Sequence, residues 1–382
     1  MREVVEEKFQ EIFKKTPSII VRSPARINLI GEHTDYNMGF VLPAAIDREI
    51  IFAIAPNHSN RAIIFALNFN EKVTINLDNL PSPQKHWVDY LVGVLEQFAQ
   101  KSLEVKGFDL VFGGNIPTGA GLSSSAAVEC GLAFGLNQLF DFQLSNIDLV
   151  KISQKAENQF VGVQCGIMDQ FASMMGQASA VILLDCQSLA YRYLPFLQEN
   201  HTLVLCDTGV KHALGDSEYN LRRQECERGV AILQKHDPTI VSLRDLSLDF
   251  LEKHQSDFDE ITYKRCHYVV AEITRVQTAC LDLAKNDLAA FGKKMYKTHA
   301  GLQNDYAVSC PELDFLVAQT QDNSGVLGAR MMGGGFGGCT INLVEKLSVD
   351  SFIQNLTLAY KTTFNLDLLC HKVSIVNGTS LM

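Results

Sequence analysis

The segment 113–127, GGNIPTGAGLSSSAA, most restricts what this chain can fold into. An apolar stretch at 107–112 precedes it and a helix-forming stretch at 124–140 follows it, which predicts a strand, a glycine-rich loop and a helix start. Gly119 and Gly121 allow the backbone to approach a ligand closely, and the free N–H groups at a helix start suit a phosphate. A well-capped helix is the structural alternative, because serine is a preferred N-cap. Capping accounts for one serine but not for two spaced glycines and three serines, so the pattern favours a phosphate-binding loop.

A second group of polar side chains lies at 26–36, RINLIGEHTDY, after an apolar stretch. Glu32, His33, Asp35 and Tyr36 fall within five residues there. Loops at strand ends often bind ligands, and closely spaced carboxylates suit the hydroxyl groups of a sugar. An exposed polar turn is the structural alternative, and the usual metal-ligand spacings are absent around His33.

Asp169 stands in an apolar stretch, GIMDQFASMM, where an unpaired charge is unusual. A buried carboxylate needs a partner, and Arg26 is one candidate. A structural salt bridge is one interpretation. A general base is the other, because carboxylates with perturbed surroundings concentrate at active sites.

The common nucleotide-binding motifs are absent from the sequence or stand in the wrong context. The chain has no G-x-x-x-x-G-K-[ST] and no H-R-D or D-F-G of protein kinases. The run 333–338, GGGFGG, formally matches G-x-G-x-x-G, but it leads into the strand-like segment CTINLV instead of a helix. We therefore expect no dinucleotide site there, and either a second backbone loop beside a ligand or a structural turn.

Composition narrows the class of protein. The 382 residues carry 33 basic and 43 acidic side chains, a net charge of −10, which argues against binding nucleic acid or an anionic membrane. No run approaches the roughly 18 apolar residues of a transmembrane helix, and the N-terminus lacks the apolar core of a secretory signal. Ten cysteines without a C-x-x-C pair disfavour zinc and a disulfide framework. We expect a cytoplasmic protein.

The hydrophobic pattern predicts an α+β protein, because strands come in runs with helices grouped between them. Predicted strands are 18–30, 49–55, 62–66, 72–77, 107–112, 179–185, 202–206, 339–344 and 371–376. Predicted helices are an amphipathic one at the N-terminus, then 88–101, 124–140, 146–161 and about 217–235. A change in composition near 190–200 predicts an N-terminal lobe over 1–195 and a C-terminal lobe over 196–382.

Taken together, these segments resemble the galactokinase family of the GHMP superfamily of small-molecule kinases. The stretch 26–43, RINLIGEHTDYNMGFVLP, is similar to the galactokinase signature. The stretch 117–127 is similar to the superfamily's ATP-phosphate loop, and 328–338, GARMMGGGFGG, to its third, glycine-rich motif. One departure is small: Ala25 stands before Arg26 where the family usually has glycine, which removes some backbone freedom.

The resemblance implies a two-lobed fold with the active site in the cleft between the lobes. It implies phosphorylation of D-galactose by ATP to galactose 1-phosphate, the first step of galactose catabolism in the Leloir pathway, with Mg²⁺ as cofactor. Asp169 would be the catalytic base, and Arg26 would hold it and stabilise the transition state. The implied sugar contacts are Glu32, His33, Thr34, Asp35, Gly166 and Tyr219. The implied ATP-binding residues are Gly119, Ala120, Gly121, Leu122, Ser123, Ser124 and Ser125. Ser125 and Glu157 would hold the metal.

Two alternatives remain open. One is a related kinase for N-acetylgalactosamine or arabinose, although Thr34 fits the galactose pattern and relatives that act on the acetylamino sugar tend to have an apolar residue there. The other is a non-catalytic galactose sensor that acts through a protein partner. The presence of Asp169, Arg26, Ser125 and Glu157 favours an enzyme, because a sensor is free to lose them. For its partners we expect galactose and ATP only, and for its oligomeric state a monomer.

Overall fold

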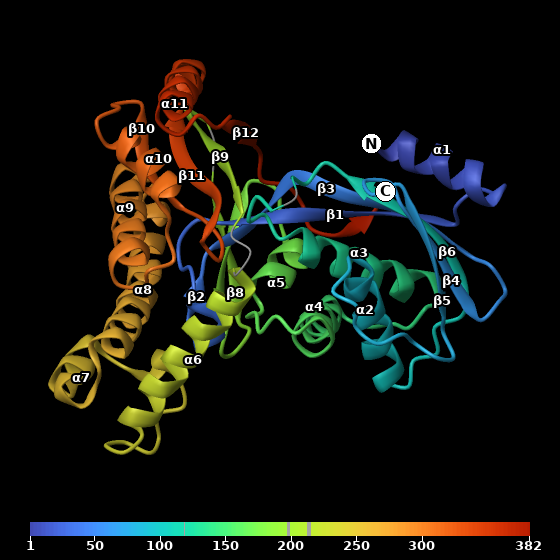
Figure 1. Cartoon of the computed structure of the whole chain (residues 1–382), viewed down its shortest axis with the longest axis horizontal. Coiled ribbons are helices and arrows are strands. Elements are labelled where there is room, and N and C mark those ends of the chain that lie inside the picture. Colours follow the sequence, from blue (N-terminus) through green and yellow to red (C-terminus); the bar gives the residue numbers. More distant parts are fainter. Residues whose placement is uncertain (118, 197–198, 212–214) are drawn as a thin grey trace.

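Strands and helices come in groups along the chain, as the hydrophobic pattern predicts (Figure 1). The computed structural model describes residues 1–117, 119–196, 199–211 and 215–382. Its strands are β1 (Ile19–Asn28), β2 (Phe40–Val41), β3 (Pro43–Pro56), β4 (Arg61–Ala66), β5 (Glu71–Asn76), β6 (Phe108–Gly114), β7 (Ala180–Asp185), β8 (Tyr191–Pro195), β9 (His201–Lys211), β10 (Val326–Met331), β11 (Gly337–Glu345), β12 (Leu369–Val373) and β13 (Ser380–Leu381). Its α-helices are α1 (Arg2–Phe13), α2 (Val88–Gln100), α3 (Ser124–Leu139), α4 (Asn146–Lys155), α5 (Met168–Met175), α6 (Gly215–Leu233), α7 (Leu248–Lys253), α8 (Glu260–Ala284), α9 (Leu288–Asn304), α10 (Pro311–Gln321) and α11 (Val349–Phe364).

The N-terminal lobe is a six-stranded sheet with strand order β13-β1-β3-β6-β4-β5. Helices α2 to α5 cover one face and α1 covers the other (Figure 1). Successive side chains of β3 point to opposite faces of the sheet. Phe52 packs in the core beneath α3, whereas Ile51 packs with Val5 and Phe9 of α1. The central strand β6 is buried along its whole length because both faces of the sheet are covered there, whereas the edge strand β5 is largely exposed.

The C-terminal lobe is built on a four-stranded sheet with strand order β10-β11-β9-β12. Val204 of β9 packs against α10 and α11, whereas its neighbour Leu203 faces a core that also contains Val276 of α8 and Ile27 of β1. The two lobes therefore share one hydrophobic cluster. A small sheet, β2-β7-β8, completes the architecture.

The division into lobes 1–195 and 196–382 stays a prediction. The composition change on which it rests includes residues 197–198, which lie outside the described residues. The last residues of the predicted second lobe return to the first sheet, where Ser380 and Leu381 of β13 pair with Arg22 and Val21 of β1.

The helix predicted over 146–161 differs from the structure. It is α-helical only to Lys155 and continues as a π-helix over Ala156–Val161, which Gly162 ends at a φ of 94°. The eight-residue helix α5 was not predicted, because a short, largely buried helix shows no polar face. Along the described residues, no helix combines the length and the apolar character that crossing a bilayer requires.

Candidate active site

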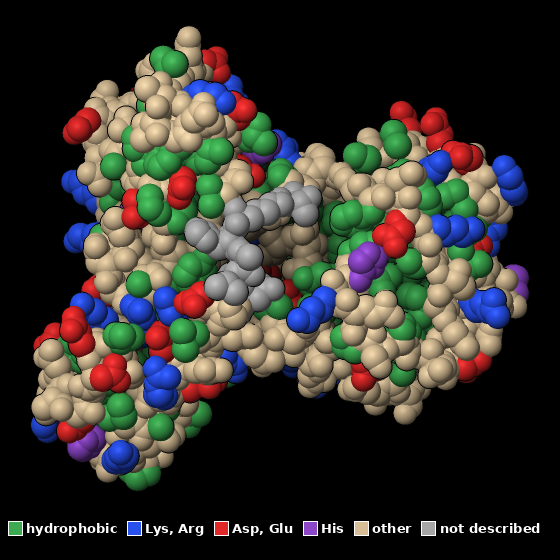
Figure 2. Space-filling model, in the orientation of Figure 1, with side chains coloured by type: hydrophobic (Ala, Val, Ile, Leu, Met, Phe, Trp, Pro, Cys, Tyr) green, Lys and Arg blue, Asp and Glu red, His purple; other side chains and the backbone are tan. Residues whose placement is uncertain are grey.

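A pocket of about 370 Å³ lies where the three sequence motifs meet, and the surface is hollowed between the lobes (Figure 2). Its walls come from the loop after β1, the start of α3, the π-helix, α5, the first half of α6 and the turn between β10 and β11. The sequence-predicted residues that line it are Arg26, Glu32, His33, Asp35, Gly119, Gly121, Leu122, Ser123, Ser124, Ser125, Glu157, Asp169 and Tyr219. Thr118 of the phosphate-loop motif lies outside the described residues.

Arg26 and Asp169 form a two-pronged ion pair in this pocket. Arg26 Nε donates to Asp169 Oδ1 over 2.7 Å, and Arg26 Nη2 donates to Oδ2 over 2.8 Å. The third nitrogen, Nη1, donates to the carbonyl oxygen of Gly121 over 2.7 Å, which ties the pair to the phosphate loop. Burial lowers the pKa of Arg26, but the carboxylates of Asp169, Glu32 and Asp35 together more than offset this, so its pKa is raised and the guanidinium stays charged.

Asp169 is less buried than its apolar neighbours suggest. Its side chain is 22% exposed, against 5% for Arg26, because the first turn of α5 opens onto the pocket. The carboxylate is therefore only partly buried, not buried as expected, and its pairing with the candidate Arg26 is confirmed. A helix N-terminus also favours a negative charge at this position.

Ala25 fits the backbone beside Arg26 without strain. The pairing of β1 with β3 shifts between Pro24 and Arg26, and Ala25 sits at this irregularity. Ala25 is absent from the residues with positive φ, so glycine is not required there.

His33 is held in the pocket wall by an aromatic cluster. It adopts a φ of 64°, its Nδ1 lies 2.7 Å from the Tyr36 hydroxyl, and that hydroxyl lies 2.7 Å from the hydroxyl of Tyr306. Burial, together with the charge of Arg222, lowers the pKa of His33 to about 3, so the ring is neutral at physiological pH. Its buried Nε2 has no hydrogen-bond partner among the described residues, which leaves it available to a ligand.

Asp35 is buried beside Gly166 in the same wall. A Cβ atom on Gly166 would lie 2.0 Å from Asp35 Oδ2, so only glycine leaves room for this carboxylate. Burial, and secondarily the charge of Asp169, raise the pKa of Asp35 to about 7. Gly166 therefore shapes the pocket through Asp35, since Gly166 itself is not part of the pocket lining.

Glu32 joins the signature loop to the third motif. Its Oε1 accepts hydrogen bonds from Arg330 Nη2 at 3.0 Å and from the backbone N–H of Gly333 at 2.8 Å. Arg330 is fully buried and also donates to the carbonyl oxygens of Asn28 and Leu29. Sequence reasoning missed Arg330, although an arginine inside the apolar run GARMM was the available signal.

Two of the residues implied as contacts, Thr34 and Ala120, lie outside the pocket lining. The Thr34 hydroxyl donates to the carbonyl oxygens of Gly31 and Phe40, at 2.9 and 2.7 Å, and Thr34 lies outside the pocket lining. Its hydroxyl is taken up by the turn, and its contact with a sugar stays a prediction. Ala120 is fully buried behind the phosphate loop and does not line the pocket either.

The two glycine-rich segments touch each other. Gly121 and Gly333 have φ values of 73° and 82°, and a Cβ atom on Gly333 would lie 3.2 Å from the carbonyl oxygen of Gly121. The glycines of 333–338 connect β10 to β11 in an antiparallel pair, so the dinucleotide fingerprint is absent there as predicted. Gly333, Gly334 and Gly335 line the pocket, which confirms a backbone loop beside a candidate ligand site.

Carboxylates gather on the side of the pocket next to Ser125. Gln170 Nε2 donates to Glu157 Oε2 at 2.7 Å and to Glu129 Oε2 at 3.1 Å. Burial and the charge of Asp169 raise the pKa of Glu157 to about 7, while a hydrogen bond with Ser125 opposes the rise. Hydroxyl and carboxylate oxygens are the ligands that Mg²⁺ prefers, and crowded carboxylates are relieved by a cation, so this donor set fits the metal.

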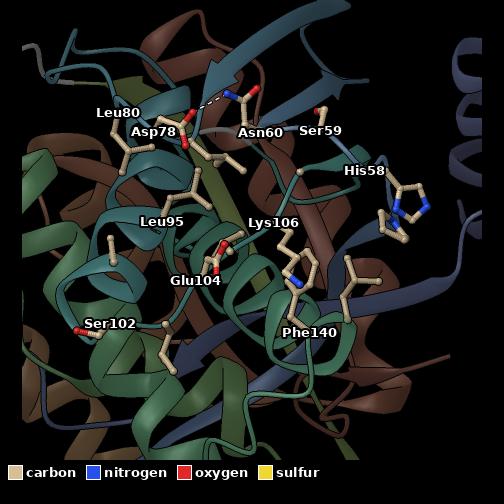
Figure 3. Close-up of a pocket in the computed structure, with 17 residues that line it drawn as sticks. His58, Ser59, Asn60, Asp78, Leu80, Leu95, Ser102, Glu104, Lys106 and Phe140 are labelled. Atoms are coloured by element: carbon tan, nitrogen blue, oxygen red, sulfur yellow. Dashed lines mark hydrogen bonds between the residues drawn. The ribbon is translucent and has the colours of Figure 1, made fainter.

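A larger hollow of about 840 Å³ lies elsewhere, beside the end of α2 (Figure 3). Its lining includes Leu95, Ser102, Glu104, Lys106 and Phe140, and none of the described residues of the three motifs contributes to it. Its size alone does not make it the active site, because the convergent polar groups lie in the smaller pocket.

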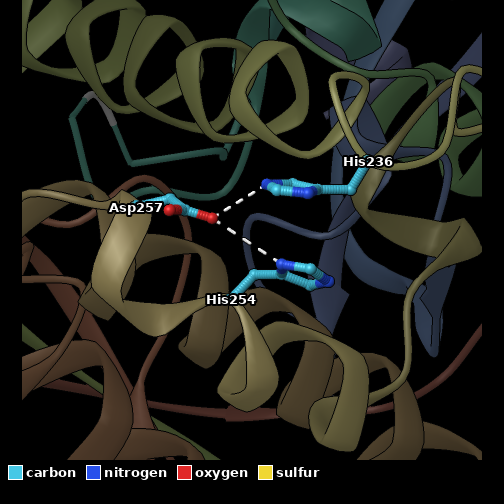
Figure 4. A group of neighbouring side chains, drawn as sticks. All are labelled: His236, His254 and Asp257. Atoms are coloured by element: carbon cyan, nitrogen blue, oxygen red, sulfur yellow. Dashed lines mark hydrogen bonds and ion pairs between the residues drawn. The ribbon is translucent and has the colours of Figure 1, made fainter.

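His236, His254 and Asp257 form a separate group at the ends of α6 and α7 (Figure 4). The two rings stack with centroids 4.0 Å apart, and Asp257 Oδ2 lies 2.8 Å from His236 Nε2. His254 Nδ1 lies 3.6 Å from the same Asp257 oxygen, so one nitrogen of each ring is turned toward that carboxylate. These contacts hold the group together by themselves, and nothing else in the described residues points to an ion there, so we assign no metal to it.

Comparison with known proteins agrees with this geometry. Family models match in three places: the galactokinase galactose-binding signature at residues 7–56, the GHMP kinases N terminal domain at 89–177, and the GHMP kinases C terminal at 281–362. The galactokinase of Fusobacterium nucleatum is 42% identical over 376 residues, covering 97% of each chain. The galactokinase of Roseiflexus sp. (strain RS-1) is 41% identical over 354 residues, 93% of this chain and 90% of that protein. The chain belongs to the galactokinase family.

Solved structures place this galactokinase-family chain in the same fold. The structure of Lactococcus lactis galactokinase complexed with galactose superposes with a TM-score of 0.96 at 34% identity, over 99% of both chains. A mevalonate kinase structure superposes with a TM-score of 0.65 at 20% identity, over 94% of this chain and all of that one, which shows a shared fold. The predicted GHMP-kinase fold is confirmed.

Proposed function

We propose that this chain transfers the terminal phosphoryl group of ATP to the C1 hydroxyl of D-galactose, giving galactose 1-phosphate and ADP. The observation that carries the proposal is the Arg26–Asp169 pair, which lies in one pocket between the galactokinase signature loop and the phosphate loop. Family membership supports galactose and ATP as the two substrates.

In this proposal the sugar lies against the signature loop. Asp35 accepts hydrogen bonds from hydroxyl groups of the sugar, and the unpartnered Nε2 of neutral His33 forms a further hydrogen bond with the sugar. Tyr219, whose ring lies 5.4 Å from that of His33, packs against the sugar from α6. A site that hydrogen-bonds one hydroxyl discriminates against the epimer, because its own buried groups are then left unpaired.

Asp169 is the base in the proposed mechanism, and Arg26 orients it. Phosphoryl transfer passes through a loose transition state, so positioning and charge neutralisation matter more than base strength. Asp169 accepts the C1 proton late, as the bond between the sugar oxygen and phosphorus forms. The charge of Arg26 and the backbone N–H groups of the phosphate loop stabilise the charge on the transferring group.

We propose Ser125 and Glu157 as the residues that would hold Mg²⁺. When bound, the ion neutralises phosphate charge. Gln170 keeps the Glu157 carboxylate in place beside Ser125 through its hydrogen bond of 2.7 Å.

A coupled ADP-release assay with galactose, N-acetylgalactosamine, arabinose and glucose tests the function. We expect turnover with galactose far above the others. If turnover is fastest with another sugar, that sugar and not galactose is the substrate. Galactose binding measured by calorimetry, with no ADP release from any sugar, would make the chain a sensor.

A further inference from the structure

Ser123 occupies the N-cap position of α3 but does not cap the helix. Its φ of 53° and ψ of 58° are left-handed, and its side chain makes no hydrogen bond to the first turn. Its Oγ instead donates to Asp169 Oδ2. By contrast, Ser145 caps α4 in the usual way, accepting from the backbone N–H of Asp148. The chain therefore gives up a helix cap at Ser123 and tolerates an unfavourable backbone conformation there.

This contact changes which oxygen of Asp169 is free. An ionised carboxylate offers about four acceptor positions, two on each oxygen. Among the described residues, Arg26 Nη2 and Ser123 Oγ both donate to Oδ2, whereas only Arg26 Nε donates to Oδ1. Both positions on Oδ2 are therefore occupied, and one on Oδ1 is open.

We infer that Ser123 is a positioning residue, which closes Oδ2 of Asp169 and leaves Oδ1 as the atom that accepts the sugar proton. The inference rests on the proposed function, because it assigns an atom to its base. It differs from the ATP-binding role that the family resemblance implies for Ser123, since the hydroxyl proton is directed to Asp169. Without the hydroxyl, the carboxylate keeps its ion pair with Arg26 but presents two open positions, so fewer bound sugars sit in the reactive geometry.

The test compares Ser123→Ala, Ser123→Gly and Ser145→Ala in the full chain, by steady-state kinetics and thermal unfolding. Loss of a hydrogen bond to a charged group predicts that Ser123→Ala lowers kcat about ten- to a hundredfold, with both KM values changed less than about threefold. Ser123→Gly removes the same hydroxyl but suits the left-handed backbone, so its kcat should be as low as that of Ser123→Ala. Ser145→Ala should show the opposite pattern, with kcat unchanged and a Tm lower by about 1 °C.

Three results would overturn the inference. If kcat of Ser123→Ala stays at the wild-type value while KM for ATP rises, Ser123 is a phosphate contact. If Ser123→Gly restores the wild-type kcat, the backbone and not the hydroxyl matters. If Ser123→Ala lowers the Tm markedly and kcat falls because part of the enzyme is unfolded, the role of Ser123 is structural. A wild-type chain without turnover on galactose would refute the proposed function instead, so the two failures are distinguishable.

Discussion

Asp35 and Asp169 are aspartates of the same pocket with different surroundings. Asp169 receives donors from Arg26 and Ser123, whereas Asp35 is buried next to other carboxylates and its pKa rises to about 7. The contrast matches the proposed roles. The Asp169 carboxylate must stay in place with its charge compensated, whereas the Asp35 carboxylate is proposed to bind sugar hydroxyls.

The first prediction concerns the base. Asp169→Asn keeps the size and hydrogen bonding of the side chain but cannot accept a proton, so turnover should fall by about two orders of magnitude or more. Galactose binding, followed by calorimetry, should largely remain. A variant that turns over at nearly the wild-type rate would make Asp169 a structural residue.

The second prediction concerns Asp35 and pH. Its carboxyl has a pKa of about 7 in the folded chain and an ordinary value of 3.8, so between these the folded state keeps a proton that the unfolded state has lost. The stability contributed by the neutral form is complete below about pH 4 and is lost as pH rises through about 7. Asp35→Asn stays neutral, so it should stabilise the ligand-free chain by about 1–3 kcal/mol at pH 8 and by little at pH 4.

Urea unfolding of wild type and Asp35→Asn at the two pH values measures this difference. An equal difference at pH 4 and pH 8 would mean that Asp35 titrates normally. The same variant should lose about 2–4 kcal/mol in apparent specificity for galactose while KM for ATP changes little.

At the scale of elements, the change from α-helix to π-helix at the end of α4 positions a residue proposed to hold Mg²⁺. The π-helix Ala156–Val161 carries Glu157 toward the start of α3, where Ser125 lies. Such π segments are common at functional sites.

We predict that Ser125→Ala and Glu157→Ala each raise the Mg²⁺ concentration needed for half-maximal rate, because a hard oxygen ligand is removed. A magnesium titration at saturating ATP measures this. If both variants respond like wild type, ATP and water hold the ion without help from these side chains.

The elements that sequence reasoning found are those with a simple local pattern. Strands such as β1 and β3 are apolar and β-branched, and the loop before α3 has its own glycine and serine signature. The π-helix could not be predicted, because its sequence continues the pattern of α4 and only packing decides the change. The pocket residues within the three motifs were identified from the sequence. Arg330 was missed, and the bonding of the Thr34 hydroxyl within its own turn was not foreseen, because both depend on which way a side chain turns after folding.

At the scale of the whole molecule, the lobes are joined by buried polar contacts as well as by a shared core. Arg330 of β10 reaches Glu32 and the carbonyl oxygens at the end of β1, so it fixes the third motif against the signature loop. Replacing Arg330 by Met leaves Glu32 buried without its charged partner. We predict that Arg330→Met lowers the free energy of unfolding by about 3–5 kcal/mol.

Adding Glu32→Gln to Arg330→Met should recover part of that stability, since the unpaired charge is then removed. Chemical denaturation of the single and double variants makes the comparison. A double variant no more stable than Arg330→Met would show that the unpaired charge of Glu32 is not what destabilises the single variant.

The most direct measurement is the identity of the product. The full chain is incubated with ATP, Mg²⁺ and either D-galactose or D-glucose at matched concentrations, and phosphorus NMR follows the coupling of the new phosphate to sugar protons. We expect one product, with phosphorus coupled to the C1 proton of galactose, and little product from glucose. A phosphate on any other carbon of galactose, or comparable product from glucose, would contradict it.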